Sequence, residues 1–422
     1  MGSMSASTQE PSLERRISLP LLTFYGLGTI LGAGIYALVG KVAGRAGMLA
    51  PWSFLLASAL ASFTAIAYAE LSSRFPRSAG EAVYVDQAFA RRWLTLGVGL
   101  LVVVTGVVSS AAMARSFAGY WGVFVDAPDW LVMVALMTAI SLLAAWGIKE
   151  SLTAAMIITL IEVAGLLLIV WVARGGLAEL PQRWGELTPG WDAGAWMGLW
   201  LGTFLAFYAF IGFEDMVNVV EEVKAPAKTV PPAIMIALVV ATFLYGLVAL
   251  AAVLALPVEQ LAVSEAPLAD IYKASTGSEP RVIALIGLFA VTNGALVQII
   301  MGSRILYGLS RAGWLPPAFG RVNHRTRTPL LATAVVTVSV LLLALWFPLE
   351  GLAEATTFII LIVFALVNIS LWRVKRRDPT PAGIRTYPLW IPVVGAVVCL
   401  GSIIFRMLSL VGIVHGAGRS LP

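Results

Sequence analysis

The sequence is poor in the residue types on which soluble enzymes and disulfide-rich scaffolds depend. Charged residues make up only 12% of the 422 residues, and the chain contains one cysteine and two histidines. The single cysteine, Cys399, excludes an internal disulfide framework and is interpreted as a small packing residue. Both histidines, His324 and His415, lie outside the long apolar runs, and the sequence has no Cys/His grouping. We therefore predict no enzyme activity, no catalytic or metal site and no cofactor.

What the chain has instead is apolar sequence in runs long enough to cross a membrane. Hydrophobic residues make up 59% of the chain and its mean hydropathy is +0.90, outside the range of soluble domains. A membrane-spanning helix needs about 20 mostly apolar residues. Eleven segments meet this requirement and predict an all-α integral membrane protein, and the apolar run 410–414 leaves open a short twelfth. The eleven lie at roughly 20–40, 48–70, 94–122, 130–147, 151–173, 196–220, 232–256, 282–304, 329–347, 352–372 and 387–405.

The distribution of Lys and Arg between these spans predicts their orientation. Positive charge is retained on the cytoplasmic side of a membrane. With the N-terminus inside, 19 of the 28 Lys and Arg residues fall on that side. We predict a protein of the cytoplasmic (inner) membrane with a cytoplasmic N-terminus and an external C-terminus. The net charge of +5 follows from this asymmetry and gives no reason to expect a nucleic-acid partner, and the cluster 373–377 is interpreted as a topology determinant rather than a lipid site.

Glycine interrupts two of the predicted spans at mid-depth. The run 21–40 contains four glycines, at 26, 28, 32 and 34, and the run 196–220 breaks at Phe210-Ile211-Gly212-Phe213-Glu214-Asp215. Glycine costs about 1 kcal/mol against alanine inside a helix, and opened backbone in hydrocarbon is tolerated only where protein or water satisfies it. Because these spans are the first and sixth, they predict a five-plus-five inverted repeat with a central substrate site. The alternative is that the glycines only permit close helix packing.

The chain is expected to form one membrane domain. We place it at 17–405, with a first repeat at about 17–174, a second at about 195–373 and an additional span at about 387–405. A polar leader, 1–16, precedes this domain, and a short tail, 406–422, follows it. Met1-Gly2-Ser3, ahead of a second start-like Met4, resembles a cloning remnant. The stretches near 174–195, 257–281 and 305–328 are long enough for short surface helices, and turns are expected at Phe75 to Gly80 and at Pro231-Pro232.

Four ordered motifs carry a resemblance to a known family. They are Thr29 to Tyr36, Ala69 to Tyr84, Phe207 to Glu214 with the following Glu221 to Pro226, and Gly302 to Arg304 with Arg311 to Pro316. In order and spacing they resemble the amino acid-polyamine-organocation permease superfamily, over about 17–405. The resemblance implies a LeuT-type fold with discontinuous first and sixth spans, and transport of amino acids or related amines by alternating access. Family members usually have twelve spans, so the missing last span leaves oligomeric contacts open.

The first break indicates how a small zwitterion could be held. No charged side chain lies between Thr23 and Val39, so opened backbone at 30–34 would supply amide groups at one helix start and carbonyl groups at another helix end. We hypothesise that amides of Ala33 and Gly34 hold a carboxylate and that carbonyls of Ile30, Tyr208 and Ile211 hold an ammonium group, as the resemblance also implies. The further candidates around this point are Thr29, Gly32, Ala209, Phe210, Gln298, Ser109 and Ser110. For Phe210 and the two serines, ordinary packing is the alternative.

One acidic residue lies in the middle of a span. Glu162 is at the centre of the fifth span, where a carboxyl group is costly and is a functional candidate by default. In several proton-coupled relatives a lysine occupies this place. Because desolvation favours the neutral form of a carboxyl group, Glu162 is predicted to exchange the coupling proton, with sodium the less favoured ion. Coordination of a cation, pairing with a basic substrate and a permanently protonated structural role are the alternatives.

Further polar residues are expected to gate the site. Glu214 and Asp215 follow the second break, where they could sense protons or simply cap the following helix, and Asn218 and Asn293 could satisfy opened backbone. An inner network of acidic and basic residues is predicted near the cytoplasmic face, with a solvated charge pattern as the alternative. Its members are Glu70, Glu81, Asp86, Glu221 and Glu222 with Arg74, Arg77 and Arg304.

These observations predict a secondary active transporter for a small amino acid or amine, embedded in the lipid bilayer and coupled to protons. Obligatory exchange of amino acids or polyamines is one alternative, and a membrane sensor that binds without transport is another. The sequence leaves the identity of the substrate and the oligomeric state open.

Overall fold

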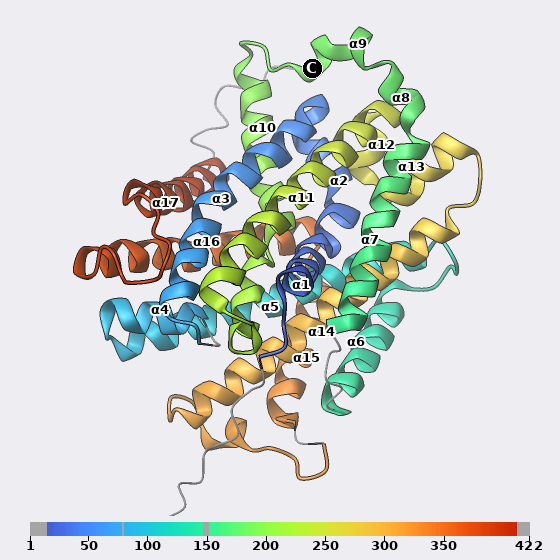
Figure 1. Ribbon diagram of the computed structural model, residues 1–422. Coiled ribbons are helices and arrows are strands. Elements are labelled where there is room, and N and C mark those ends of the chain that lie inside the picture. The colour runs from blue at the N-terminus through green and yellow to red at the C-terminus, as the bar shows by residue number, and fades with distance from the viewer. Residues whose placement is uncertain (1–14, 78–79, 147–151, 327, 412–422) are drawn as a thin grey trace, which may run out of the picture.

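The computed structural model describes residues 15–77, 80–146, 152–326 and 328–411 (Figure 1). Most of the predicted leader and tail, together with Ser78 and Ala79 of the second motif, lie outside these residues. Within them the chain is helical almost throughout, and its one extended pairing is an isolated parallel bridge between Ile17 and Val223. The predicted all-α class is confirmed.

Each predicted span has a helical counterpart. Among the described residues, eight helical stretches are long and apolar enough to cross a membrane, and three shorter apolar helices accompany them. The helices that correspond to the eleven predicted spans are α1 (Leu19–Leu31) with α2 (Ala33–Ala46), α3 (Ala50–Arg74), α5 (Arg92–Trp121), α6 (Asp129–Trp146), α7 (Leu152–Val172), α10 (Ala193–Ala206) with the 3-10 segments η3 (Phe207–Phe210) and η4 (Phe213–Glu222), α11 (Pro226–Ala255), α14 (Arg281–Arg311), α15 (Leu330–Trp346), α16 (Leu349–Arg377) and α17 (Trp390–Leu410).

Short helices occupy the connections. The stretches singled out for surface helices contain α8, α9 and η2, then α12 and α13, then η5, and α4 follows the Phe75 turn. Their bounds are α4 (Gly80–Phe89), α8 (Arg174–Ala178), α9 (Leu180–Arg183), η2 (Trp184–Leu187), α12 (Val258–Val263), α13 (Pro267–Thr276) and η5 (Pro317–Gly320), and η1 (Gly47–Leu49) joins α2 to α3. In Figure 1, α8 and α9 lie at the top of the molecule and α17 lies beside α16 at the left edge.

Small residues bring the long helices together. Helices α3 and α11 pack along each other, and both contain fully buried alanines, among them Ala57, Ala61 and Ala65 of α3 and Ala237 and Ala241 of α11. Lipid is as apolar as these helices, so their association depends on close contact rather than on the hydrophobic effect, and small side chains permit that contact. The packed helices form the frame that holds the two interrupted spans.

One predicted turn is wrong. Pro231 and Pro232 lie inside α11, which begins five residues earlier with Pro226 in its first turn. Proline lacks the amide hydrogen and therefore removes backbone hydrogen bonds from a helix, which is why a boundary was expected. In membrane proteins such helices persist because neighbouring groups satisfy the freed carbonyls.

Candidate functional site

The first predicted interruption is present and is confined to one residue. Helix α1 ends at Leu31, α2 begins at Ala33, and Gly32 between them has φ −42° and ψ −140°. The opened stretch is therefore shorter than the predicted 30–34, because one rotated residue is enough to separate two helices. A Cβ atom added to Gly32 would lie 4.0 Å from the Met113 methyl carbon and from the Thr29 carbonyl oxygen, which is ordinary van der Waals contact and not a clash.

The second interruption begins earlier than predicted and extends further. Helix α10 ends at Ala206, and η3 is followed by extended Ile211 and by Gly212 with φ +131°. Side chains are rarely compatible with that φ value, and a Cβ atom at Gly212 would lie 2.4 Å from the Thr29 carbonyl oxygen. Glycine is required here by conformation and by space. The chain then continues as a 3-10 helix, so the span does not regain α-helical geometry before Glu222.

The two interruptions touch each other. A Cβ atom at Gly34 would lie 2.4 Å from the Ala209 Cα atom, so the start of α2 packs directly on the backbone of η3. The Thr29 hydroxyl lies 2.9 Å from the Gly212 carbonyl oxygen and equally near that of Gly26. Residues that are far apart in sequence thus form one buried site. The glycines at this site also permit close packing, so the alternative interpretation of them and the predicted interruption are both part of the same arrangement.

Tyr245 joins both interruptions and was missed by the sequence analysis. Its hydroxyl on α11 lies 2.6 Å from the Ile30 carbonyl oxygen and 3.0 Å from that of Ala209. Its ring packs edge-on against Phe210, with 5.1 Å between centroids. The available signal was a tyrosine at the middle of an apolar span, because a buried phenol needs a hydrogen-bond partner. The Ile30 carbonyl, proposed as an ammonium ligand, is within reach of this donor.

The other predicted substrate residues lie around the same point. The hydroxyls of Tyr208 and Ser109 are 3.1 Å apart, and the Tyr208 carbonyl accepts a hydrogen bond from the Ile211 amide at 3.2 Å. Gln298 on α14 donates to Asp215 Oδ2 at 3.2 Å, which links α14 to the second interruption. Ser110 is fully buried on α5. None of these predicted residues lines the apolar pocket described below.

The predicted gating residues take different positions. The Glu214 carboxylate accepts a hydrogen bond from the Gly212 amide at 2.8 Å, which fits the capping interpretation. The Asn218 amide donates to the Met301 sulfur at 3.3 Å, and Asn293 lies half-buried on α14. The Glu214 side chain thus bonds directly to the opened backbone of the second interruption.

Glu162 on α7 is buried beside the interruptions. The residue is 1% exposed, and neither carboxyl oxygen has a hydrogen-bond partner within the described residues. The Tyr36 hydroxyl donates instead to the Glu162 backbone carbonyl at 2.9 Å, and the carboxyl group interacts electrostatically with Tyr36 and Tyr245. A buried polar group without a partner requires an explanation, and a proton or a bound cation would provide one.

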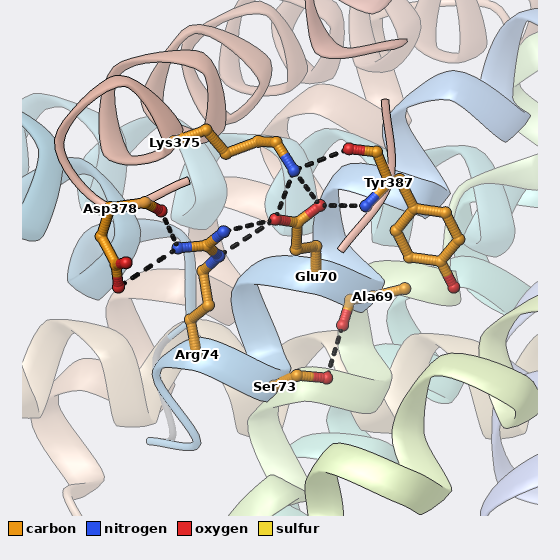
Figure 2. Close-up of polar contacts among 7 residues, drawn as sticks. All are labelled: Ala69, Glu70, Ser73, Arg74, Lys375, Asp378 and Tyr387. Atoms are coloured by element: carbon orange, nitrogen blue, oxygen red, sulfur yellow. Dashed lines mark hydrogen bonds and ion pairs between the residues drawn. The ribbon is translucent and has the colours of Figure 1, made fainter. Parts of the chain in front are cut away.

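A buried ion cluster lies where α3 and α16 end (Figure 2). Glu70 is fully buried, and its carboxylate accepts hydrogen bonds from Arg74 at 2.7 Å, from Lys375 at 2.7 Å and from the Tyr387 amide at 3.0 Å. The Arg74 guanidinium also donates to the Asp378 carbonyl at 2.8 Å. The predicted Glu70–Arg74 pair is present, but Lys375 was not predicted. Because buried charges need partners, this cluster holds α3, α16 and the following loop together.

Other contacts close the same end of the molecule. Glu81 on α4 accepts a hydrogen bond from the Tyr68 hydroxyl at 3.0 Å, and burial raises the pKa of Glu81 above its usual value despite this bond. The backbone of Ile17 bonds to the Glu222 carbonyl at 3.0 Å and to the Lys224 amide at 2.9 Å. The segment before α1 is therefore attached to the end of η4, so both interrupted spans are fixed to each other below the site.

Two interrupted apolar helices that touch each other, beside a buried carboxyl group that has no hydrogen-bond partner among the described residues, are features of a membrane transporter. The comparisons identify the family. The sequence profile described as "Amino acid permease" matches residues 17–420, and the chain belongs to this family. The resemblance carried by the four motifs is thereby confirmed.

Curated relatives support this membership over most of the chain. An uncharacterized transporter of Mycobacterium tuberculosis is 31% identical over 390 residues, covering 92% of this chain and 85% of the relative. The branched-chain amino acid permease of Bacillus subtilis is 26% identical over 400 residues, and the match covers 89% of this chain and 84% of the relative. Cationic amino acid transporter 4 of Mus musculus is 29% identical, and the match covers 90% of this chain and 62% of the relative. Transport of amino acids is thus the activity of the family to which the chain belongs.

Proposed function

We propose that the protein is a proton-coupled secondary transporter that moves an amino acid across the cytoplasmic membrane by alternating access, within a five-plus-five inverted repeat. The contact between the two interrupted spans carries this proposal, because it places opened backbone from both halves at one buried point. Membership of the amino acid permease family supports amino acids as the substrate class.

The substrate carboxylate would bind at the start of α2. Amides at a helix N-terminus carry partial positive charge, and the amides of Ala33 and Gly34 lie there. The backbone is less tightly packed at Gly32 than at Gly34, since a Cβ atom added at Gly32 would only reach van der Waals contact. The fit to a neutral zwitterion follows because the surrounding span supplies no charged side chain that would compete for either substrate charge.

The ammonium group would bind carbonyls at the ends of the interrupted helices. The Tyr245 hydroxyl has one proton and lies within hydrogen-bonding distance of two carbonyl oxygens, those of Ile30 and Ala209. At any moment one of these carbonyls is available to another donor. Tyr245 would therefore shift its hydrogen bond when the substrate binds. In this way α11, which carries Tyr245, would also respond to substrate binding.

Glu162 would carry the coupling proton. Its carboxyl group is buried, has no hydrogen-bond partner among the described residues and lies close to Tyr36 and Tyr245, which contact the interrupted spans. Charging this carboxyl group in its buried site is costly, so proton loss favours a rearrangement that admits water or a cation. Proton binding and movement of the first span are thereby connected.

A second candidate uses the same carboxyl group differently. An unpaired buried carboxylate is also a suitable partner for the basic side chain of a cationic amino acid. Two relatives carry names that indicate different substrates, branched-chain in one and cationic in the other. Exchange of cationic amino acids or polyamines is therefore the alternative to proton symport.

The decisive experiment measures uptake of radiolabelled amino acids into proteoliposomes containing the full-length protein. Under an imposed inward proton gradient and without internal substrate, the wild type should accumulate substrate. Glu162→Gln, which keeps the shape and removes the titration, should lose gradient-driven uptake while retaining substrate-induced thermal stabilisation. Glu279→Gln is the matched control, because that glutamate is exposed in a surface ion pair.

Each alternative predicts a different result. Unchanged gradient-driven uptake and pH dependence in Glu162→Gln would refute the coupling role. Loss of lysine and arginine binding alone, with neutral amino acids still driven by the gradient, would favour the cationic-substrate role. Absence of saturable, stereoselective counterflow in the wild type would instead favour a sensor.

A further inference from the structure

An apolar pocket that is lined by none of the predicted substrate residues opens on the side of the molecule. It has a volume of about 270 Å³ and lies between α3, α10, α16 and α17. Phe204, Phe207 and Leu361 form its buried floor, whereas Trp200 and Gly401 are exposed at its rim. The floor is therefore reached only by a group that enters between the helices.

The polar atoms of the pocket offer little to water. Seven of the ten lining residues carry apolar side chains, and the Thr203 hydroxyl already donates to the Leu199 carbonyl at 2.8 Å. Water in a cavity needs polar partners, usually two to four. An empty cavity, on the other hand, deprives its lining atoms of dispersion contacts. An apolar occupant would restore these dispersion contacts without needing polar partners.

We propose that the pocket binds one acyl chain of a bilayer phospholipid. The four helices are among the stretches that are long and apolar enough to span the membrane, so the medium beside the rim is hydrocarbon. The rings of Trp200 and Phe405 are 6.5 Å apart between centroids. A helix with its side chains is about 10–12 Å wide and does not fit between these helices, whereas a flexible acyl chain does.

The bound chain would contact the segment that leads to the second interruption. Phe207 in the floor is the first residue of η3 and directly precedes Tyr208, whose hydroxyl lies 3.1 Å from that of Ser109. The Phe207 ring also packs on Phe364 of α16, with 6.1 Å between centroids. Occupation of the pocket therefore supports the position of η3. The effect on transport rests on the proposed function, whereas the binding itself does not.

Photo-crosslinking tests the site. The full-length protein is reconstituted with phosphatidylcholine that carries a diazirine near the middle of one acyl chain, irradiated and mapped by mass spectrometry. The expected result is labelling of Phe204 and Phe207, which are only 6% and 3% exposed and are shielded from lipid on the outer surface. Gly401→Phe should reduce this labelling several-fold, because a Cβ atom at Gly401 meets no atom within 4 Å and the new ring can enter the pocket.

Val397→Phe is the matched control. It adds a ring to the same helix about one turn earlier, at a position that is 64% exposed to the surroundings, and should leave the labelling unchanged. Absence of labelling at residues 203–207 in the wild type, or equal labelling in Gly401→Phe, would overturn the proposal. Crosslinks through this segment between two copies of the protein would also overturn it, and would show that a second copy of the chain occupies the pocket.

A second variant and a second measurement keep the test decisive. If Gly401→Phe lowers the melting temperature, Ser402→Leu fills the same pocket with a smaller group and should again reduce labelling. Initial uptake rates are compared between Gly401→Phe and Val397→Phe, and a change confined to the former supports the link to η3. Failure of transport in every variant would count against the proposed function, while the labelling would still decide the lipid site.

Discussion

At the scale of single residues, the glycines at the interruptions are needed for close contact between elements and not only for breaking the helices. Gly26 and Gly28 face Met216 and Thr159 so closely that an added Cβ atom would lie 2.2 Å from each side chain. At Gly32, in contrast, an added Cβ atom would make only ordinary contacts, at 4.0 Å. One glycine therefore separates the helices, and the others allow neighbouring elements to approach.

Gly34→Ala should destabilise the protein and abolish transport. The added Cβ atom would lie 2.4 Å from the Ala209 Cα atom, and the obstructing group is backbone, which cannot rotate away. Overpacking of this kind costs about 1–3 kcal/mol. Thermal unfolding of the purified protein and counterflow of amino acid are the measurements.

Gly97→Ala on α5 is the control for this substitution. A Cβ atom there meets nothing within 4 Å, and alanine favours helix over glycine by up to about 1 kcal/mol, so stability should be kept or raised. An active Gly34→Ala variant of wild-type stability would contradict the contact between α2 and η3.

At the scale of elements, the Glu70 cluster connects the end of α3 to α16 and to the loop that follows it. Glu70 and Lys375 are both buried, and Arg74 shares the same carboxylate oxygen (Figure 2). Breaking a buried ion pair by removing one partner costs more than replacing both, because an uncompensated charge is left behind.

Glu70→Gln should therefore be strongly destabilising, by about 3–5 kcal/mol, because two buried cations lose their shared anion. Lys375→Met should cost less, since Glu70 keeps Arg74. The double variant should be more stable than the sum of the single effects predicts, which a double-mutant cycle of thermal unfolding measures. Additive effects would mean that Glu70 and Lys375 are not coupled.

An element could be predicted from the sequence where the signal for it lies in the same stretch of sequence. Glycine in apolar runs and the mid-span Glu162 indicated where to look for the interruptions and the buried carboxyl group. Their extents were not predictable, since the early start of the second break at Phe207 and the passage of α11 through Pro231 depend on neighbouring helices.

At the scale of the whole molecule, ion pairs hold helices at both ends of the bundle. Opposite the Glu70 cluster, Arg45 at the end of α2 lies 3.2 Å from Glu350 of α16, and Glu354 pairs with Arg406 of α17. In the proposed transport cycle, one set of contacts must open while the other stays closed. The two clusters are the places where such a change would be seen.

The predicted orientation can be tested by cysteine labelling in a Cys399→Ala background, which carries no other cysteine. Glu279→Cys lies between α13 and α14, in a connection predicted to be external, and should react with a membrane-impermeant maleimide in intact cells. Arg321→Cys lies between α14 and α15, predicted to be internal, and should react only after lysis. The reverse pattern would show an external N-terminus.

The sequence by itself determined the membrane class, the approximate spans and the two interruptions, because apolar length and glycine act locally. Only the tertiary structure decided that Gly34 meets Ala209, that Tyr245 bridges both breaks and that Lys375 pairs with Glu70. The physical reason is that a membrane span is apolar on every side, so its sequence has no polar stripe to indicate which face meets which neighbour. Those pairings arise when the helices pack.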